Sequence, residues 1–127
     1  MTISEASKKF GLSSDTLRYY EKIGLLPNVS RNKNGIRIYS NEDCRWIEFI
    51  KCMRNAGLSI ESLSKYIILF HEGDKTINER KNLLKDQMEL LLEKKKSIDE
   101  TIMRLEYKIN NYEKILSKSQ KLNRKML

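Results

Sequence analysis

Two cysteines and one histidine are the side chains in this sequence that are most suited to covalent or metal chemistry. They are Cys44, Cys52 and His71. Three such residues are too few for a zinc site of the usual Cys/His spacing. An enzyme with Cys52 as nucleophile and His71 as base would also need an orienting partner and an oxyanion-forming loop, and no glycine-rich segment suggests one. We therefore expect no metal, no cofactor and no enzymatic activity.

Cys52 lies in the apolar-periodic stretch WIEFIKCMRNAGL, which covers residues 46–58. Free cysteine is among the most buried residue types, so core packing is one interpretation. Lys51 and Arg54 are its sequence neighbours, and nearby cations favour the reactive thiolate. Cys44 follows two acidic residues, which disfavour its thiolate, and we expect it to be structural. From the residues alone, Cys52 stays open between packing and thiol chemistry.

A second group of side chains is suited to binding phosphate. Between positions 18 and 37 five basic residues stand against a single acidic one, Glu21, and the basic set is Arg18, Lys22, Arg31, Lys33 and Arg37. Tyr19, Tyr20 and Tyr39 lie among them and supply hydroxyl donors for phosphate oxygens. The whole chain carries 25 Lys and Arg against 17 Asp and Glu, a net charge of +8. This balance favours a polyanionic partner, and double-stranded DNA is the leading candidate.

Two short helices must position these side chains. Thr2 and Glu5 have the spacing of a capping box, which predicts a helix from the first residues to Gly11. Ser13 is a favoured N-cap residue and predicts a second helix that ends at Gly24. Because the segment FGLSS that joins them is short, the pair is a helix-turn-helix candidate.

The second of these helices has two faces. Helical spacing places Arg18, Tyr19 and Lys22 on an exposed sector, while Leu17 and Tyr20 point the other way. We therefore expect the exposed sector to meet DNA.

A small β-ribbon is predicted after Pro27. Asn34-Gly35 tolerates the positive φ angles of a tight turn, and it lies between the β-prone arms 29–31 and 36–39. Such a ribbon beside a helix-turn-helix is a wing, and it would carry Lys33 and Arg37.

Two further helices complete the N-terminal part. Asn41 is the expected cap of a third helix that ends near Gly57, and Ser59 begins a fourth that ends at Gly73. The apolar residues of the third helix predict its core face, which comprises Trp46, Ile47, Phe49, Ile50 and Met53.

From Asp74 onward the sequence contains neither Gly nor Pro, and apolar residues recur every seven positions. Two such rows are the a/d seam of a coiled coil, although Lys81 and Lys95 interrupt the second row. A lone amphipathic helix would leave its apolar stripe in water, so we expect the seam to meet an identical chain in a homodimer. The predicted seam is Leu84, Met88, Leu91, Ile98, Ile102, Leu105, Ile109, Tyr112 and Leu116.

These patterns predict a mainly α protein with three parts. Residues 1–73 are the winged helix-turn-helix domain, 74–118 the dimerisation helix, and 119–127 a basic, disordered tail. The first ten residues lack the apolar core of a signal peptide, and no apolar run approaches the ~18 residues of a membrane span. We expect a cytoplasmic protein without a membrane partner.

Three segments, TISEASKKFGLSSDTLRYYEKIGLL, NGIRIYS and IKCMRNAGLSIESL, followed by a long heptad helix, resemble the MerR family of bacterial transcription regulators. The resemblance covers nearly the whole chain. It implies a winged helix-turn-helix domain and an antiparallel two-helix coil between protomers. It also implies that the dimer occupies an over-long promoter spacer and, when activated, kinks and untwists the DNA so that RNA polymerase engages both promoter elements.

The resemblance assigns roles to individual positions. It implies that Arg18 and Tyr19 contact the DNA backbone, that Arg37 and Tyr39 contribute from the wing, and that Arg54 contacts a phosphate after the third helix. Together with the basic pattern, the expected DNA-binding set is Arg18, Tyr19, Lys22, Lys33, Arg37, Tyr39 and Arg54.

The chain departs from several branches of that family. Metal-sensing branches carry cysteines in regions that here read GDKTINE and KSQKLNRKML, and neither segment contains one. The chain instead resembles the AdhR/NmlR-like branch, which has one cysteine in the third helix, and Cys52 falls on that position. This resemblance implies that aldehydes or other thiol-reactive electrophiles modify Cys52. The alternative keeps DNA binding, takes its signal from a small ligand or partner protein, and leaves Cys52 structural.

Overall fold

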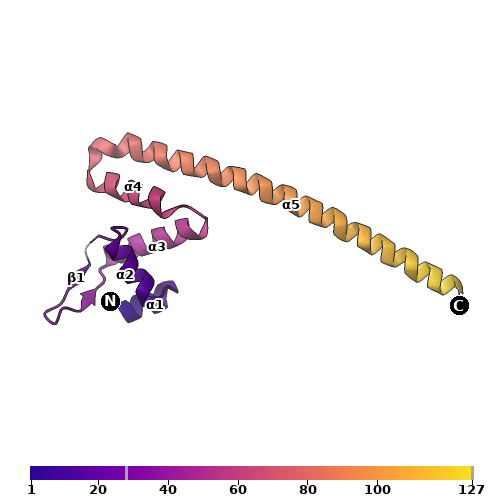
Figure 1. The fold of residues 1–127 in the computed structure, drawn as a ribbon, viewed down its shortest axis with the longest axis horizontal. Coiled ribbons are helices and arrows are strands. Elements are labelled where there is room, and N and C mark those ends of the chain that lie inside the picture. Colours follow the sequence, from indigo (N-terminus) through magenta and orange to yellow (C-terminus); the bar gives the residue numbers. More distant parts are fainter. Residues whose placement is uncertain (28, 127) are drawn as a thin grey trace. The chain divides into compact units, whose positions relative to one another are not determined.

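The computed structural model describes residues 1–27 and 29–126, with side chains described up to residue 119. The chain forms two compact units, Met1–Gln87 and the part from Met88 onward. Helices dominate both, and the single sheet of the described residues is a two-stranded ribbon in the first unit (Figure 1). The prediction of a mainly α chain with a wing and a long C-terminal helix is confirmed.

Helices α1 (Ile3–Phe10) and α2 (Ser14–Lys22) form the helix-turn-helix. Thr2 and Glu5 make the predicted capping box, and the chain leaves α1 through Gly11 at φ 65°, in the left-handed region that glycine enters without strain. The Ser13 side chain accepts a hydrogen bond from the amide of Thr16 and begins α2, as its type predicts. Side chains from both helices pack inward, namely Ala6, Phe10, Leu17 and Tyr20.

The wing consists of β1 (Ser30–Arg31) and β2 (Arg37–Ile38), paired antiparallel with Arg31 opposite Arg37. Its strands are shorter than the predicted arms, because Asn32 organises a longer loop. The Asn32 side-chain oxygen accepts hydrogen bonds from the amides of Asn34 and Ile36, at 2.9 and 3.0 Å. Within this loop only Gly35 has a positive φ, 75°, so the connection is a turn followed by a left-handed glycine rather than a two-residue turn.

Helices α3 (Asn41–Asn55) and α4 (Ile60–His71) close the core of the first unit. The N-cap of α3 is Ser40 rather than the expected Asn41, because Ser40 forms a capping box with the buried Asp43. Ser59 caps α4 as predicted. The core face of α3 is narrower than predicted. Ile47 and Ile50 are fully buried, whereas Trp46, Phe49 and Met53 are half-buried.

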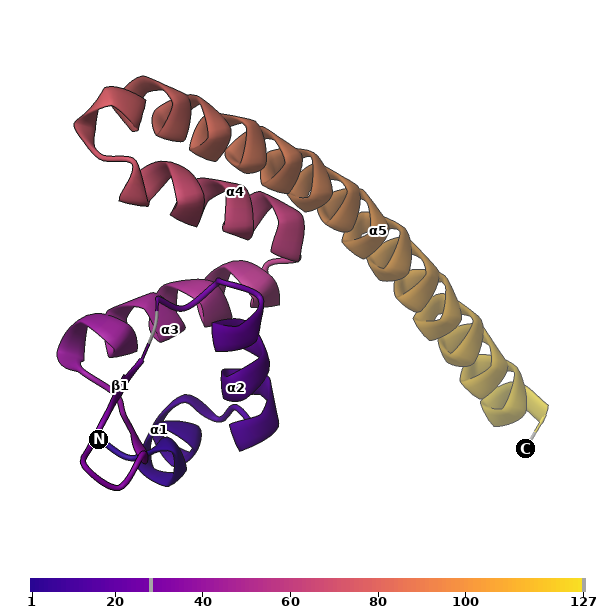
Figure 2. The same cartoon turned by 60° about the vertical axis from the view of Figure 1, so that its left-hand side comes forward.

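A short 3₁₀ turn, η1 (Asp74–Thr76), leads into α5 (Ile77–Met126). Thr76 and Glu79 have the spacing of a capping box in the sequence, but the Thr76 side chain makes other contacts. The buried Thr76 hydroxyl donates to the carbonyls of Leu69 and Gly73, and it accepts a hydrogen bond from Arg80. The Arg80 guanidinium also lies 5.3 Å from the centre of the Phe70 ring. These contacts join the end of α4 to the first turn of α5. Figure 2 shows how the chain reverses direction between these two helices.

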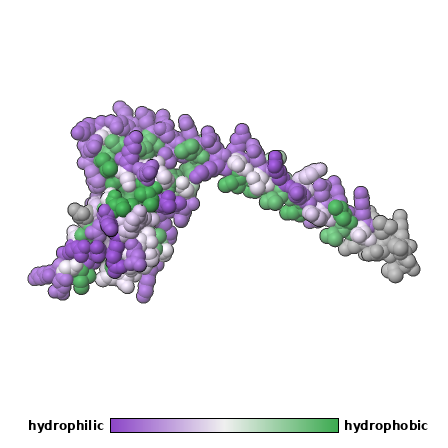
Figure 3. Space-filling view, in the orientation of Figure 1, coloured by the Kyte–Doolittle hydropathy of each residue, from purple (hydrophilic) through white to green (hydrophobic). Residues whose placement is uncertain are grey.

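Helix α5 has 50 residues, which corresponds to about 75 Å at 1.5 Å per residue. The helix continues through residues 119–126, where we expected a disordered tail, and the side chains from residue 120 onward lie outside the described part. The seam rows are in water in the single chain: Leu91 is half-buried, and every other predicted seam side chain is exposed, from 38% at Leu84 to 67% at Tyr112. Apolar patches recur along this helix in Figure 3. No helix among the described residues is both long and apolar enough to cross a membrane.

Candidate nucleic-acid interface and thiol groove

The outer face of α2 presents the predicted recognition residues to solvent. Leu17 and Tyr20 are buried, while the Arg18 side chain and Tyr19 are each 48% exposed and Lys22 is exposed. Because α2 is capped at Ser13 and anchored by its buried residues, the backbone from which these three side chains extend is held in place. They form a cationic and aromatic strip that can meet phosphate oxygens.

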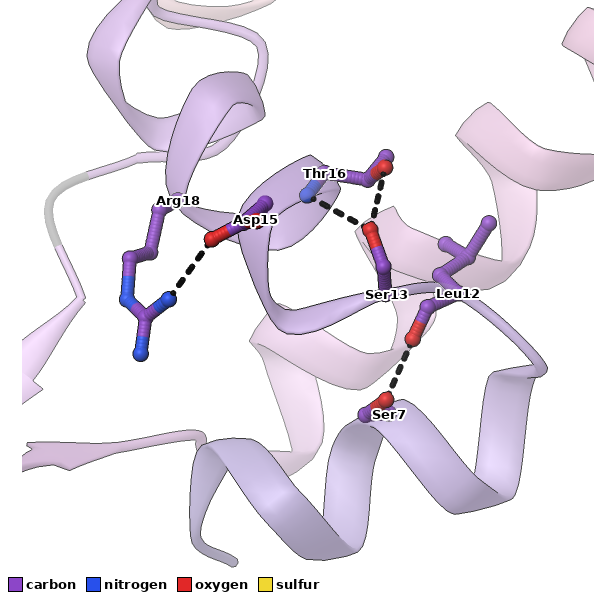
Figure 4. Close-up of polar contacts among 6 residues, drawn as sticks. All are labelled: Ser7, Leu12, Ser13, Asp15, Thr16 and Arg18. Atoms are coloured by element: carbon purple, nitrogen blue, oxygen red, sulfur yellow. Dashed lines mark hydrogen bonds and ion pairs between the residues drawn. The ribbon is translucent and has the colours of Figure 1, made fainter.

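Arg18 is held by a weak local partner. Its guanidinium lies 3.0 Å from the Asp15 carboxylate, one turn earlier on the same helix, and that carboxylate is 96% exposed (Figure 4). Exposed pairs of this kind contribute little free energy, in the range of about 0 to 1 kcal/mol. Arg18 can therefore exchange Asp15 for a DNA phosphate at small cost.

Arg37 is held much more firmly, in a contact that connects the wing to α2. Its Nε donates to Glu21 Oε2 at 2.8 Å, across sixteen positions of sequence. The side chains are only 25% and 14% exposed, so the pair is largely shielded from water. Arg37 thus fixes the wing against α2. Its other guanidinium N–H groups remain as possible donors to a DNA phosphate.

Tyr39 does not present its hydroxyl to solvent as we expected. The residue is 2% exposed, and its Oη has no hydrogen-bond partner among the described residues. Burial raises the pKa of this hydroxyl above its usual value, and the carboxylate of Glu21 raises it further. Its backbone is fixed too, since the Tyr39 amide donates to the carbonyl of Met1 at 2.7 Å. Tyr39 is therefore a core residue directly after the wing strand β2.

A signal for the contact between Arg37 and Glu21 is present in the sequence. Glu21 is the single acidic residue between positions 18 and 37, and it is therefore the natural partner for a wing arginine. The sequence analysis counted Glu21 only in the charge balance and missed its ion pair with Arg37.

Arg54 is exposed at the end of α3, but part of its guanidinium has an internal partner. Its Nη1 donates to the Leu58 carbonyl at 2.7 Å, across the turn between α3 and α4. Lys33, in the wing loop, is exposed. The structure thus places Tyr19, Lys22 and Lys33 as exposed side chains and Arg18 as an exposed side chain with a weak local partner. Arg37 and Arg54 each use part of the guanidinium in an internal hydrogen bond.

The two thiols differ in exposure and border the same groove. Cys52 is exposed, which does not agree with simple core packing, and Cys44 is half-buried with its sulfur 3.8 Å from the Met1 sulfur. The groove has a volume of about 640 Å³ and lies between the end of α1 and one side of α3. Among the described residues no three His, Cys, Asp or Glu side chains lie close enough together to hold a metal ion.

Residues 1–68 match the family model of the MerR HTH family regulatory proteins. The chain belongs to the MerR family. This match covers more than half of the 127 residues and includes α1, α2, the wing, α3 and most of α4. The chain is thus a regulator of a transcription-factor family and not an enzyme, as we expected.

Individual relatives support the same assignment. The HTH-type transcriptional regulator AdhR of Bacillus subtilis is 58% identical over 93 residues, which span 73% of this chain and 66% of AdhR, slightly less than two thirds of that protein. A MerR family regulator structure from Listeria monocytogenes superposes with a TM-score of 0.90 at 47% identity, over 95% of this chain and 92% of that one.

A third relative was solved with DNA. HiNmlR, a MerR family regulator that lacks the sensor domain, is bound to promoter DNA in its crystal structure. It superposes with a TM-score of 0.81 at 34% identity, over 89% of this chain and 90% of that one. The predicted resemblance to the AdhR/NmlR-like branch of the MerR family is therefore confirmed.

Proposed function

We propose that this chain is a transcription regulator of the cytoplasm that binds double-stranded promoter DNA. The observation that carries this proposal is the exposed strip of Arg18, Tyr19 and Lys22 on a capped, anchored helix beside a wing. HiNmlR, whose fold matches over 89% of this chain, binds promoter DNA, which supports the same use of the strip. Exposed Lys33 adds a wing contact, and Arg37 and Arg54 contribute their remaining N–H groups.

The binding species we propose is a homodimer joined by α5 as an antiparallel coiled coil. The support is the exposed apolar seam, since side chains such as Ile98 and Leu105 are 59% and 55% exposed in the single chain. Covering them removes apolar surface from water, which is the main favourable term in association. A two-fold symmetric dimer carries two α2 strips, so its target has two half-sites related by a dyad.

From the resemblance to the MerR family we propose that the dimer, with both half-sites engaged, bends or untwists the duplex. The cost of that deformation depends on the DNA sequence. In this mechanism RNA polymerase is an indirect partner, because it responds to the altered promoter geometry.

The signal we propose is covalent modification of Cys52 by an aldehyde or another thiol-reactive electrophile. Support comes from the exposure of Cys52, which leaves its sulfur accessible, and from the 58% identity to AdhR. With an aldehyde, the sulfur bonds to the carbonyl carbon and the thiol proton passes to the oxygen. The product is a hemithioacetal, formed without a leaving group or a change of oxidation state. Cys52 lies near the α3–α4 turn that Arg54 braces, so an adduct can change that turn.

The alternative keeps DNA binding and takes the signal from a small ligand or partner protein, with Cys52 structural. A selection from a random duplex library, followed by fluorescence-anisotropy titration of the selected duplex with and without formaldehyde, tests both steps. We expect wild type and Cys44→Ser to bind the duplex and to change affinity with formaldehyde. Cys52→Ser should bind equally well and show no change. An unaltered response of Cys52→Ser favours the alternative, and absence of any duplex selection rejects the DNA-binding proposal.

A further inference from the structure

The groove between α1 and α3 brings nucleophiles and cations together. Its lining includes two thiols, three basic side chains and one carboxylate, namely Cys44, Cys52, Lys9, Arg45, Lys51 and Glu48. At about 640 Å³ it has the size of a small-molecule site. The DNA-binding strip on α2 contributes none of the lining residues.

The two thiols in this α1–α3 groove are separate nucleophiles and not a disulfide pair. They lie eight residues apart on one straight helix, which separates them by about 12 Å along its axis. A disulfide requires its two Cα atoms within about 7 Å. Cys52 is exposed and Cys44 is half-buried against Met1, so Cys52 is the more accessible nucleophile.

The cations of the groove are positioned by contacts that leave their charge unneutralised. The Lys9 ammonium lies 5.5 Å from the centre of the Phe10 ring, which is itself part of the groove wall. The Lys51 ammonium lies close to Gly11, since a Cβ built on that glycine would be 3.6 Å from it. Within the described part of the chain neither lysine, nor Arg45, forms an ion pair. Three positive charges against that of Glu48 leave a net charge of +2 on the lining.

We propose that the α1–α3 groove selects small anionic electrophiles, which are compounds that carry a carboxylate beside the carbon that reacts with a thiol. The cations hold the carboxylate, and the sulfur of Cys52 bonds to the neighbouring aldehyde carbon. The carbonyl double bond becomes single, and the thiol proton passes to its oxygen, so that a hemithioacetal forms without a leaving group. This proposal deepens the proposed function and rests on it for its regulatory meaning, because it names the class of compound to which Cys52 responds. A neutral aldehyde gains nothing from the cations, whereas an anionic one is concentrated beside the thiol.

Iodoacetate and iodoacetamide are the probes that test this charge selection. They have nearly the same size and react alike: the sulfur–carbon bond forms, the carbon–iodine bond breaks, iodide leaves and the thiol proton passes to water. They differ in charge. The full-length Cys44→Ser variant keeps Cys52 as its one thiol, and intact-mass measurement over time gives both second-order rate constants. The urea-unfolded chain supplies the reference ratio.

We expect the iodoacetate to iodoacetamide rate ratio in the folded chain to exceed the unfolded ratio about three- to tenfold at low salt. This excess of the folded over the unfolded ratio should shrink in 0.5 M salt, where the screening length for charges is only a few ångströms. Arg45→Gln and Lys9→Gln should each reduce it, and Arg45→Lys, which keeps the charge, should preserve it. Lys65→Gln removes an exposed cation of α4 outside the groove and is the matched control.

A folded ratio equal to the unfolded one, or unchanged by Arg45→Gln, overturns the proposal. So does a loss of duplex affinity in Lys9→Gln and Arg45→Gln as large as that in Arg18→Ala, because the cations would then serve DNA. Failure here is separable from failure of the proposed function. If formaldehyde still changes duplex affinity through Cys52 while the ratio shows no charge preference, only the selection is wrong. If the preference is present but the alkylated chain binds duplex unchanged, thiol sensing is wrong and the groove stands.

Discussion

At the scale of single residues, the basic side chains assigned to DNA differ in how firmly the protein holds their charge. Arg18 has an exposed partner that is easily replaced, Lys22 and Lys33 are free on the surface, and Arg37 is anchored by a shielded carboxylate. The gain from binding a phosphate should therefore be largest for Lys22 and Lys33, smaller for Arg18 and smallest for Arg37, because a side chain that must leave a good internal partner gains less from DNA.

Arg18→Ala is expected to weaken binding to all duplexes and to lower the steepness of the salt dependence. Each phosphate contact contributes close to one unit to the slope of log K against log salt, so the slope should fall by about one for each chain bound. Anisotropy titrations between 50 and 200 mM salt measure it. An unchanged slope would mean that Arg18 contacts no phosphate.

The buried Tyr39 hydroxyl makes the free energy of unfolding decrease at alkaline pH. Because burial raises its pKa in the folded chain, the folded state holds the hydroxyl proton more tightly than the unfolded state above pH about 10. Its stabilising contribution is complete below the unfolded pKa and is lost as the pH rises through the folded pKa. We expect Tyr39→Phe to reduce the loss of thermal stability between pH 9 and 11. Tyr107→Phe, at a site 69% exposed, should behave as wild type, and identical pH profiles for all three proteins would contradict this account.

At the scale of elements, the contact between Glu21 and Arg37 connects the wing to α2. It predicts that the loss of one negative charge lowers the affinity for DNA, which is the opposite of the usual effect. Removing a negative charge from a DNA-binding face should by itself raise affinity. Glu21→Gln also leaves Arg37 without its charged partner and frees the wing. We therefore expect Glu21→Gln to lower duplex affinity about three- to tenfold, although it makes the face more positive.

Asp15→Asn is the matched control for Glu21→Gln. It removes the same charge from the same helix, but its pair is exposed and joins no two elements. Anisotropy should show a small gain in affinity for Asp15→Asn, and Arg37→Lys should lose affinity like Glu21→Gln. A gain for both carboxylate variants would show that the wing does not depend on this contact.

The sequence was sufficient for elements with local signals and insufficient where tertiary contacts decide. Thr2, Ser13 and Ser59 begin their helices as their residue types predict. Ser40 replaces Asn41 as the cap of α3, since both types are good caps and the buried Asp43 decides between them. The roles of Thr76 and Arg54 depend on carbonyl groups that only the folded turns bring near.

The candidate site divides in the same way. Helical periodicity was enough to place Arg18, Tyr19 and Lys22 on the exposed face of α2. The burial of Tyr39 depends on packing between the wing and the N-terminal residues, which no local pattern contains.

At the scale of the whole molecule, we propose that the exposed seam of α5 joins two chains into the dimer that binds DNA. Ile102 and Met103 are adjacent and both exposed, at 46% and 67%, but only Ile102 belongs to the heptad rows. We expect Ile102→Glu to shift sedimentation equilibrium toward monomer, because two charges would be buried in the coil. Met103→Glu should stay dimeric. Equal dimerisation of both variants would show that chains do not meet along this seam.

The central claim, that a homodimer reads a two-fold symmetric duplex, is tested most directly by the dependence of affinity on the second half-site. Anisotropy and sedimentation should compare the selected duplex with a duplex of the same length in which one half-site is scrambled. We predict two chains per intact duplex and at least about a tenfold loss of affinity on scrambling, because one of two modules loses its contacts. One chain per duplex with equal affinity for both DNAs would contradict the account.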